Sequence, residues 1–168
     1  MKLPLLQLLL LLTPFLLAGR TATAQPAAVQ VLPPTPAAPA AIRPKMARAD
    51  SALAEPLQQA RRTLGQARKR YAAGLPGGTR CLVTVRVLAS DTSFRQVQAR
   101  VIGWRDGAVQ ALISPGEAAS DAADLRPVSF PEAAVLDWTF LAANGREEGN
   151  FVGKYLDTAR QLENMPFR

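Results

Sequence analysis

This chain is restricted to a fold that contains both helix and strand. Its apolar residues first recur at helical spacing and then change to the two-residue spacing of strands. Between residues 50 and 73 apolar side chains recur at alternating spacings of four and three, which places them along one side of a helix. They are Leu53, Leu57, Ala60, Leu64, Ala67 and Tyr71. The helix begins at Ser51 or Glu55, since either start keeps Pro56 near the first turn. Gly74 predicts its end.

Alternating apolar residues after a glycine-rich loop predict a first strand over Thr79–Leu88. One face carries Cys81, Val83, Val85 and Val87, and the other carries Leu82, Thr84, Arg86 and Leu88. A turn at Asp91–Ser93 leads to a second strand around Val97–Val101. The favoured hairpin pair Asp106-Gly107 then precedes a third strand near Val109–Ile113. An antiparallel meander is therefore expected.

Shorter elements follow the meander. Ser114–Asp124 lacks a period and predicts a loop. Leu125–Phe130 predicts a short edge strand, because Pro127 cannot donate to a central ladder. Residues 131–134 can form one helical turn.

A last hairpin is predicted across the turn pair Asn144-Gly145, with strands at Val135–Leu141 and Gly149–Leu156. The C-terminal tail, residues 158–168, is expected to form a short helix or to fray. Together these patterns predict an α+β domain over residues 50–157, with an N-terminal amphipathic helix followed by a curved antiparallel sheet of about five strands.

The first 24 residues have the order of a cleavable signal peptide. Lys2 precedes an apolar run from Leu3 to Ala18, and the small residues Ala22-Thr23-Ala24 follow. A retained anchor is the alternative, but the run has only about 16 residues where a span needs roughly 20. We expect cleavage after Ala24, export to the periplasm or the outside, and no transmembrane span afterwards.

Residues 25–49 form a Pro/Ala-rich segment. Its six prolines, at positions 26, 33, 34, 36, 39 and 44, remove backbone donors and restrict φ. We expect an extended spacer through which neither a helix nor a ladder can run. A Pro-rich docking motif is a less favoured alternative.

The formal net charge of +7 is concentrated in one short stretch. The basic residues there are Arg61, Arg62, Arg68, Lys69 and Arg70. Such a cluster can attract nucleic acid, acidic glycan or anionic lipid, although export argues against nucleic acid. Arg61, Arg62, Arg68 and Lys69 lie off the apolar stripe. A solvated helix face is favoured over a dedicated anion site.

The chain has no histidine and one cysteine, Cys81, which removes His-dependent nucleophiles, thiolate metal sites and internal disulfides. Cys81 is interpreted as a small buried apolar residue. Glu147 and Glu148 are adjacent in a strand and so cannot share a substrate. Asp121 and Asp124 are expected to be solvated. We expect a non-enzyme without catalytic residues, cofactor or metal.

Asp137-Trp138 is the most distinctive local pair. Trp138 could form a binding surface on which Asp137 selects a cation or a donor. The favoured interpretation is a core tryptophan, with Asp137 accepting backbone N–H groups at the turn before the strand. Trp104 is similarly expected to pack in the core.

Five short motifs occupy the second half of the chain. They are Arg105-Asp106-Gly107, Val128-Ser129-Phe130, Leu136-Asp137-Trp138, Asn144-Gly145 and Glu148-Gly149-Asn150-Phe151-Val152-Gly153-Lys154. This set resembles the YegJ-like family of small bacterial proteins, a domain of unknown function, over roughly residues 53–156. The resemblance implies a helix followed by a curved antiparallel sheet, and implies no activity. Family members tend to carry a Glu-His pair where this chain has Ser93-Phe94-Arg95-Gln96.

Export, small size and missing catalytic groups favour a non-catalytic envelope protein. We expect its sheet face or basic helix to bind another protein, as an inhibitor or immunity-like factor. The alternative is a binder of anionic polymer or membrane surface through the helix face of Arg61, Arg62, Arg68 and Lys69. An unusual hydrolase is a third and weaker possibility.

Overall fold

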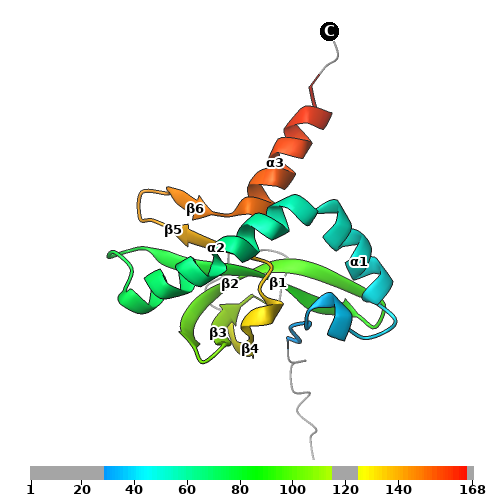
Figure 1. Cartoon of the computed structure of the whole chain (residues 1–168), viewed down its shortest axis with the longest axis horizontal. Coiled ribbons are helices and arrows are strands. Elements are labelled where there is room, and N and C mark those ends of the chain that lie inside the picture. The colour runs from blue at the N-terminus through cyan, green and yellow to red at the C-terminus, as the bar shows by residue number, and fades with distance from the viewer. Residues whose placement is uncertain (1–28, 115–124, 166–168) are drawn as a thin grey trace, which may run out of the picture.

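A computed structural model describes residues 29–114 and 125–165. The predicted signal peptide, residues 115–124 with Asp121 and Asp124, and the last three residues lie outside the described residues. Within the described ranges, six strands form one antiparallel sheet accompanied by three α-helices, which confirms the α+β class (Figure 1). The helices are α1 (Arg43–Ala52), α2 (Ala54–Ala73) and α3 (Phe151–Glu163); the strands are β1 (Arg80–Ser90), β2 (Ser93–Arg105), β3 (Ala108–Ile113), β4 (Arg126–Pro131), β5 (Asp137–Leu141) and β6 (Glu147–Gly149).

The strand order across the sheet is β4-β3-β2-β1-β5-β6. The first three strands form the predicted meander, and β4 extends it at the edge of the sheet. Between β2 and β3, Asp106 and Gly107 have φ values of 52° and 73°, the left-handed conformation that a two-residue hairpin turn requires. From β4, which is an edge strand as expected, the chain crosses through the single turn η3 (Glu132–Ala134) to β5. Strand β5 pairs with β1 and places Trp138 opposite Val83.

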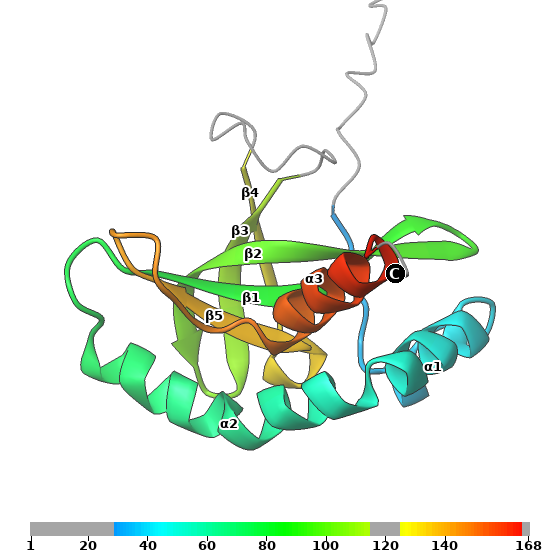
Figure 2. The same ribbon diagram turned by 90° about the horizontal axis from the view of Figure 1, so that it is seen from above.

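The main core lies between α2 and one face of the sheet. The alternating residues predicted for this face, from Cys81 to Val87, are all buried. Ala67 of α2 belongs to the same buried cluster, and Leu64 and Tyr71 pack against it. Figure 2 shows α2 running along this side of the sheet. The apolar stripe of α2 and the alternating apolar residues of the sheet therefore pack against each other, because each removes an apolar face from water.

A second, smaller core involves residues that were predicted to be an extended spacer. Leu88 and Phe94 alternate with Val87 and belong to the other face of the β1–β2 hairpin. They pack against a buried cluster formed by Leu32, Ala38, Ile42 and Met46. The expectation of neither helix nor ladder in residues 25–49 was wrong. Helix α1 begins at Arg43, and Val31 forms an antiparallel bridge with Val87.

The prolines permit this arrangement because of where they fall. Pro44 occupies the first turn of α1, where its missing N–H has no partner to lose. Pro36 occupies the same kind of position in the 3-10 turn η1 (Thr35–Ala37). Apolar side chains between the prolines then gain burial against the hairpin, which outweighs the local preference for an extended chain.

A buried ion pair joins α1 to β1. Arg86 is 2% exposed, and its Nη2 donates to Asp50 Oδ1 at 2.7 Å. Its guanidinium carbon lies 5.1 Å from the centre of the Phe94 ring. A charge this deeply buried requires a partner, so the pairing with Asp50 fixes the end of α1 against the sheet.

The last predicted strand is a helix instead. Strand β6 ends at Gly149, and α3 begins at Phe151, so the expected strand over Gly149–Leu156 was wrong. Asn150, with φ 55°, turns the chain between them. Helix α3 continues to Glu163, into the region where a short helix or fraying was expected. No helix in residues 29–114 or 125–165 is long and apolar enough to cross a membrane.

Candidate binding site

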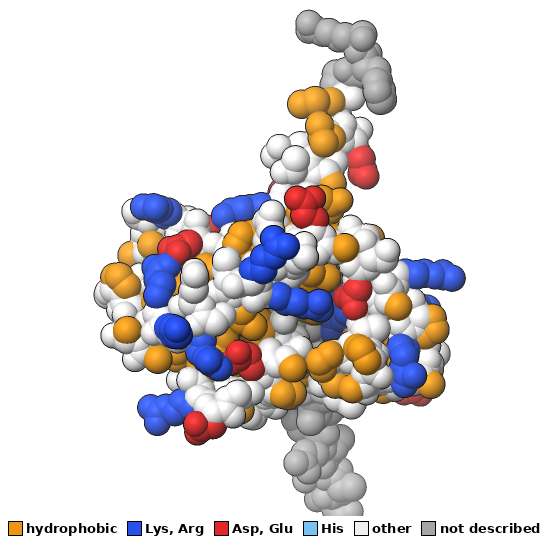
Figure 3. All heavy atoms as spheres, in the orientation of Figure 1, with side chains coloured by type: hydrophobic (Ala, Val, Ile, Leu, Met, Phe, Trp, Pro, Cys, Tyr) orange, Lys and Arg blue, Asp and Glu red, His pale blue; other side chains and the backbone are white. Residues whose placement is uncertain are grey.

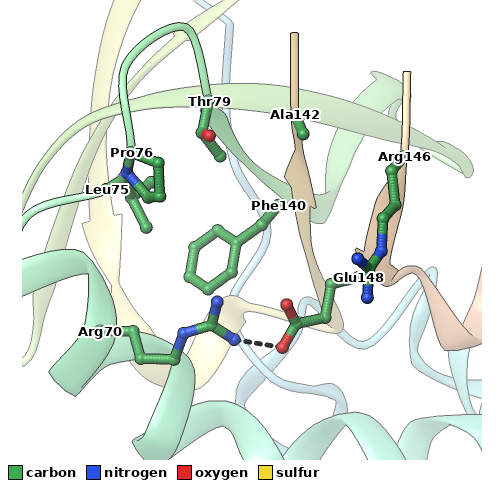
Figure 4. A pocket seen from close by; sticks show the side chains of 8 residues that line it. All are labelled: Arg70, Leu75, Pro76, Thr79, Phe140, Ala142, Arg146 and Glu148. Atoms are coloured by element: carbon green, nitrogen blue, oxygen red, sulfur yellow. Dashed lines mark hydrogen bonds and ion pairs between the residues drawn. The ribbon is translucent and has the colours of Figure 1, made fainter. Parts of the chain in front are cut away.

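The end of α2, the loop after it and the β5–β6 hairpin line a hollow of about 330 Å³ that is open to solvent. Its apolar lining consists of Leu75, Pro76, Phe140 and Ala142. Its polar lining consists of Arg70, Thr79, Arg146 and Glu148 (Figure 4). Gly78 brings the loop against the hairpin, since a Cβ at that position would lie 3.0 Å from the Ala143 Cβ. The volume is at the lower end of the range found for small-molecule sites.

Arg70 connects the two sides of the hollow. It lies in the last turn of α2, and its Nη1 donates to Glu148 Oε1 on β6. Its guanidinium carbon is 5.0 Å from the centre of the Phe140 ring, a cation–π distance. Both charged side chains are 50% exposed, so the ion pair orients the two groups more than it stabilises the fold.

Arg146 supplies the excess charge of the hollow. It is exposed and forms no ion pair with any described residue. It precedes Glu148 by two positions in the hairpin, and Figure 4 shows the two side chains close together. Two guanidinium groups and one carboxylate leave one positive charge beside an apolar wall. This combination suits a carboxylate or phosphate attached to an apolar group.

The predicted basic residues of α2 do not form a single surface. Arg68 donates to Glu132 at 3.1 Å, and the same carboxylate accepts from Trp104 Nε1 at 2.8 Å. Arg68 therefore joins α2 to the β4–β5 crossing. Arg61, Arg62 and Lys69 are exposed and have no ion pair within the described part of the chain. None of these four residues lines the hollow.

Asp137 and Trp138 belong to the core, which rules out the surface interpretation of this pair. They are 1% and 5% exposed. Trp138 Nε1 donates to Thr63 Oγ1 of α2 at 3.0 Å. Asp137 accepts two backbone N–H groups at 2.7 Å, from Trp138 and from Val152 in the first turn of α3. The carboxylate thus caps α3 from a neighbouring strand.

Burial controls the titration of the core groups. Desolvation raises the pKa of Asp137, partly offset by the backbone donors of Val152, Trp138 and Phe151. Desolvation also raises the pKa of the Cys81 thiol to about 12, so the sulfur stays protonated at neutral pH and is a poor nucleophile. Cys81 is buried, as expected. Among the described residues, no group of three His, Cys, Asp or Glu side chains is placed to hold a metal ion.

The residues that line the hollow were not predicted as a site. The sequence presents Arg70 only as one of five basic residues in a short stretch. It gives no reason to place Arg70 beside Arg146 or Glu148. One local signal was present, because residues two apart in an extended hairpin share a face, which puts Arg146 and Glu148 together. No local pattern connects them with Arg70, which precedes Glu148 by 78 positions.

The comparisons with known proteins leave the chain without an assigned relative. No protein-family model, curated protein or solved structure matches it.

Proposed function

We propose that this protein is an exported, non-catalytic binding module whose hollow between α2 and the β5–β6 hairpin receives an acidic segment of a protein partner. The observation that carries the proposal is Arg146, which has no ion pair with a described residue and lines the hollow with Arg70, Leu75 and Pro76. An acidic side chain next to an apolar one would match both parts of this lining. An inhibitor or immunity-like factor would act in this way, by occupying a partner's surface.

A binder of anionic polymer or membrane surface is the second candidate. Arg61, Arg62 and Lys69 favour it, because all three are exposed and none pairs with a described carboxylate. Such binding is electrostatic and depends steeply on salt. The hollow favours the protein partner instead, since it offers apolar contact that a polyanion would not use. A hydrolase has less support, because Glu148 is paired with Arg70 and Glu147 accepts from Asn150.

The location and the finer fold description are part of the same proposal. We infer a signal peptide over residues 1–24, export to the periplasm or the outside, and a role in the envelope. We also propose that the arrangement of an N-terminal amphipathic helix followed by a curved antiparallel sheet is the one shared with the YegJ-like family. Neither inference implies an activity.

A crosslinked pull-down with the tagged mature chain, residues 25–168, tests the proposal. The bait is incubated with envelope fractions of its host and washed at low and at high salt. A protein partner should survive high salt. The Arg146→Glu variant should retain about tenfold less of it, because reversing one charge of a close interfacial pair costs at least about 1.4 kcal/mol. Protein taken from the envelope should begin at Gln25.

Arg62→Glu is the matched control, since it reverses the same charge on α2 outside the hollow. It should leave the retained partner unchanged. If both variants lose the partner equally and high salt releases acidic polymer or lipid, the functional surface is the exposed basic side of α2 formed by Arg61, Arg62 and Lys69. A chain exported without cleavage would contradict the signal-peptide inference alone.

A further inference from the structure

Helix α3 extends away from the rest of the molecule. Its first turn is held by Val152, which is 2% exposed and clusters with Leu57 and Leu136, and by Phe151, which contacts the Trp138 ring. Beyond that turn every residue to the end of the helix except Ala159 is exposed. Figure 1 shows α3 projecting from the sheet and the other helices. Tyr155 and Thr158 line an open hollow with Pro56 and Gln59 of α2, so contact with the rest of the described fold ends near the middle of α3. A helix end without tertiary contacts is marginal in water.

The projecting part carries an apolar ridge. Leu156, Ala159 and Leu162 are three residues apart and so follow one another along the helix surface. Leu156 is 39% exposed and Leu162 is 61% exposed. Tyr155 and Met165, beside this ridge, are exposed to 45% and 62%. Figure 3 shows apolar side chains along the projecting segment. The described residues include nothing that covers the ridge.

We propose that this ridge packs against the same ridge of a second copy of the chain, with the two α3 helices antiparallel and crossing near Ala159. The small side chain of Ala159 at the centre allows the helix axes to approach, and Leu156 of one copy then lies beside Leu162 of the other. Contact with a second copy would bury the side chains that a lone α3 leaves in water. The contact goes beyond the binding role proposed for the hollow, whose lining includes no residue of α3.

The charged side chains of α3 favour a second copy of the chain as the partner and favour an antiparallel orientation. A second row with three-residue spacing runs beside the apolar ridge and alternates in sign: Lys154, Asp157, Arg160 and Glu163. In an antiparallel pair the same flank of both helices meets, so Asp157 faces Arg160 of the second copy. Lys154 lies opposite Glu163 in the same row, although its Nζ also donates to the Gly149 carbonyl oxygen within its own chain at 2.7 Å. In a parallel pair the charged row would face the uncharged flank of Tyr155, Thr158 and Gln161. The pattern is therefore complementary to itself in one direction only.

The Arg160–Asp157 contact of 3.3 Å within the helix does not oppose this arrangement. Both side chains are more than 60% exposed, so they can exchange their partners at little cost. The interface is limited to about two turns from each copy, which is small compared with interfaces of stable dimers. A reversible dimer is expected, with a dissociation constant in roughly the micromolar to millimolar range.

Sedimentation equilibrium of the mature chain, residues 25–168, from about 1 µM to about 1 mM tests the proposal. The wild-type chain should pass from monomer to dimer. Leu162→Lys should raise the dissociation constant at least tenfold, because it places a cation in the apolar seam. Ile102→Lys is the matched control, since Ile102 is 51% exposed on β2, and it should leave association unchanged. A chain that stays monomeric at every concentration overturns the proposal, as does equal weakening by both variants.

Charge reversal separates this interface from a general loss of helix. Asp157→Lys alone should weaken association, since it faces Arg160 of the second copy. The double variant Asp157→Lys with Arg160→Glu should restore it, because the antiparallel row is again complementary. Circular dichroism should remain unchanged throughout. Failure of the double variant to restore the dimer excludes the antiparallel register.

Cysteine crosslinking gives an independent test of direction. Mixed chains carrying Leu156→Cys and Leu162→Cys should form a disulfide with each other, whereas Leu162→Cys alone should not, because antiparallel helices place its two copies beyond disulfide reach. Cys81 is buried and does not interfere. Self-crosslinking of Leu162→Cys would show a parallel pair and overturn the proposal.

Discussion

At the scale of single residues, the buried carboxylate of Asp137 connects β5 to the start of α3. Asp137 is almost fully buried and yet satisfies two backbone donors, one from its own strand and one from α3. Its burial raises the pKa of the carboxyl group. The folded state therefore binds a proton at Asp137 more tightly than the unfolded chain does, and this couples stability to pH.

The coupling predicts the sign of a pH effect. Below the ordinary aspartate pKa of about 3.9 the preference of the folded state for protonated Asp137 is fully present, and it is lost as pH rises through the higher folded value. The free energy of unfolding of wild type minus that of Asp137→Asn should therefore decrease between about pH 3.5 and pH 7. Urea unfolding at a series of pH values measures it. A difference that increases with pH would contradict the raised pKa.

At the scale of elements, the junction between β6 and α3 depends on the absence of a side chain. Gly149 has φ 80°, and a Cβ there would lie 2.2 Å from the Trp138 carbonyl oxygen and 2.8 Å from the Trp138 ring. The strand can end beside β5 only because this position is glycine. Gly153 is less constrained, since its Cβ would lie 2.2 Å from Asn150 Oδ1, the end of a side chain that can move away. Gly149 therefore shapes the strand-to-helix turn.

Two glycine variants separate the loss of stability caused by a positive φ from the loss caused by a steric clash of the new Cβ. Gly149→Ala should lower the free energy of unfolding by about 3 kcal/mol or more, through a positive φ and a clash with backbone. Gly145→Ala has nearly the same φ, 81°, but its Cβ would meet nothing within 4 Å. It should cost only about 1 kcal/mol. Denaturant unfolding of both variants measures the difference, and equal losses would show that contact with Trp138 has no effect.

At the scale of the whole molecule, the segment before α2 is part of the folded unit. It pairs with β1 through Val31, covers Leu88 and Phe94, and places Asp50 on the buried Arg86. Arg86 Nε has no hydrogen-bond partner within the described structure, so the guanidinium depends on Asp50 for compensation of its charge. This ion pair therefore adds a charged contact to the backbone pairing and apolar packing that connect the N-terminal segment to the sheet.

A double-mutant cycle tests that dependence. Asp50→Ala should destabilise the mature chain by about 3 kcal/mol, because it leaves a buried guanidinium without a carboxylate. Replacing both residues, as Asp50→Ala with Arg86→Met, should recover most of this loss, since no buried charge remains. Thermal and urea unfolding measure the three variants and wild type. If the losses of unfolding free energy for Asp50→Ala and Arg86→Met instead add up to the loss for the double variant, the two charges do not stabilise each other.

Local patterns in the sequence determined those helices, strands and turns whose apolar or turn-forming residues recur at a regular short spacing. The stripe of α2, the alternation of β1 and the Asp106-Gly107 turn could each be predicted, because period and turn geometry are properties of adjacent residues. The core position of Trp138 and the acceptor role of Asp137 followed from their residue types. The absence of histidine excludes His-dependent sites by composition alone.

Contacts between distant residues decided what the sequence alone left undetermined. Helix α1 forms because Leu32, Ile42 and Met46 gain burial on a hairpin far along the chain, which no proline count can reveal. Helix α3 replaces a predicted strand because Asp137, 15 residues before Val152, caps its first turn. The hollow exists only where Arg70 meets the β5–β6 hairpin. Burial and charge pairing act through space, so their outcome depends on which segments the sheet brings together.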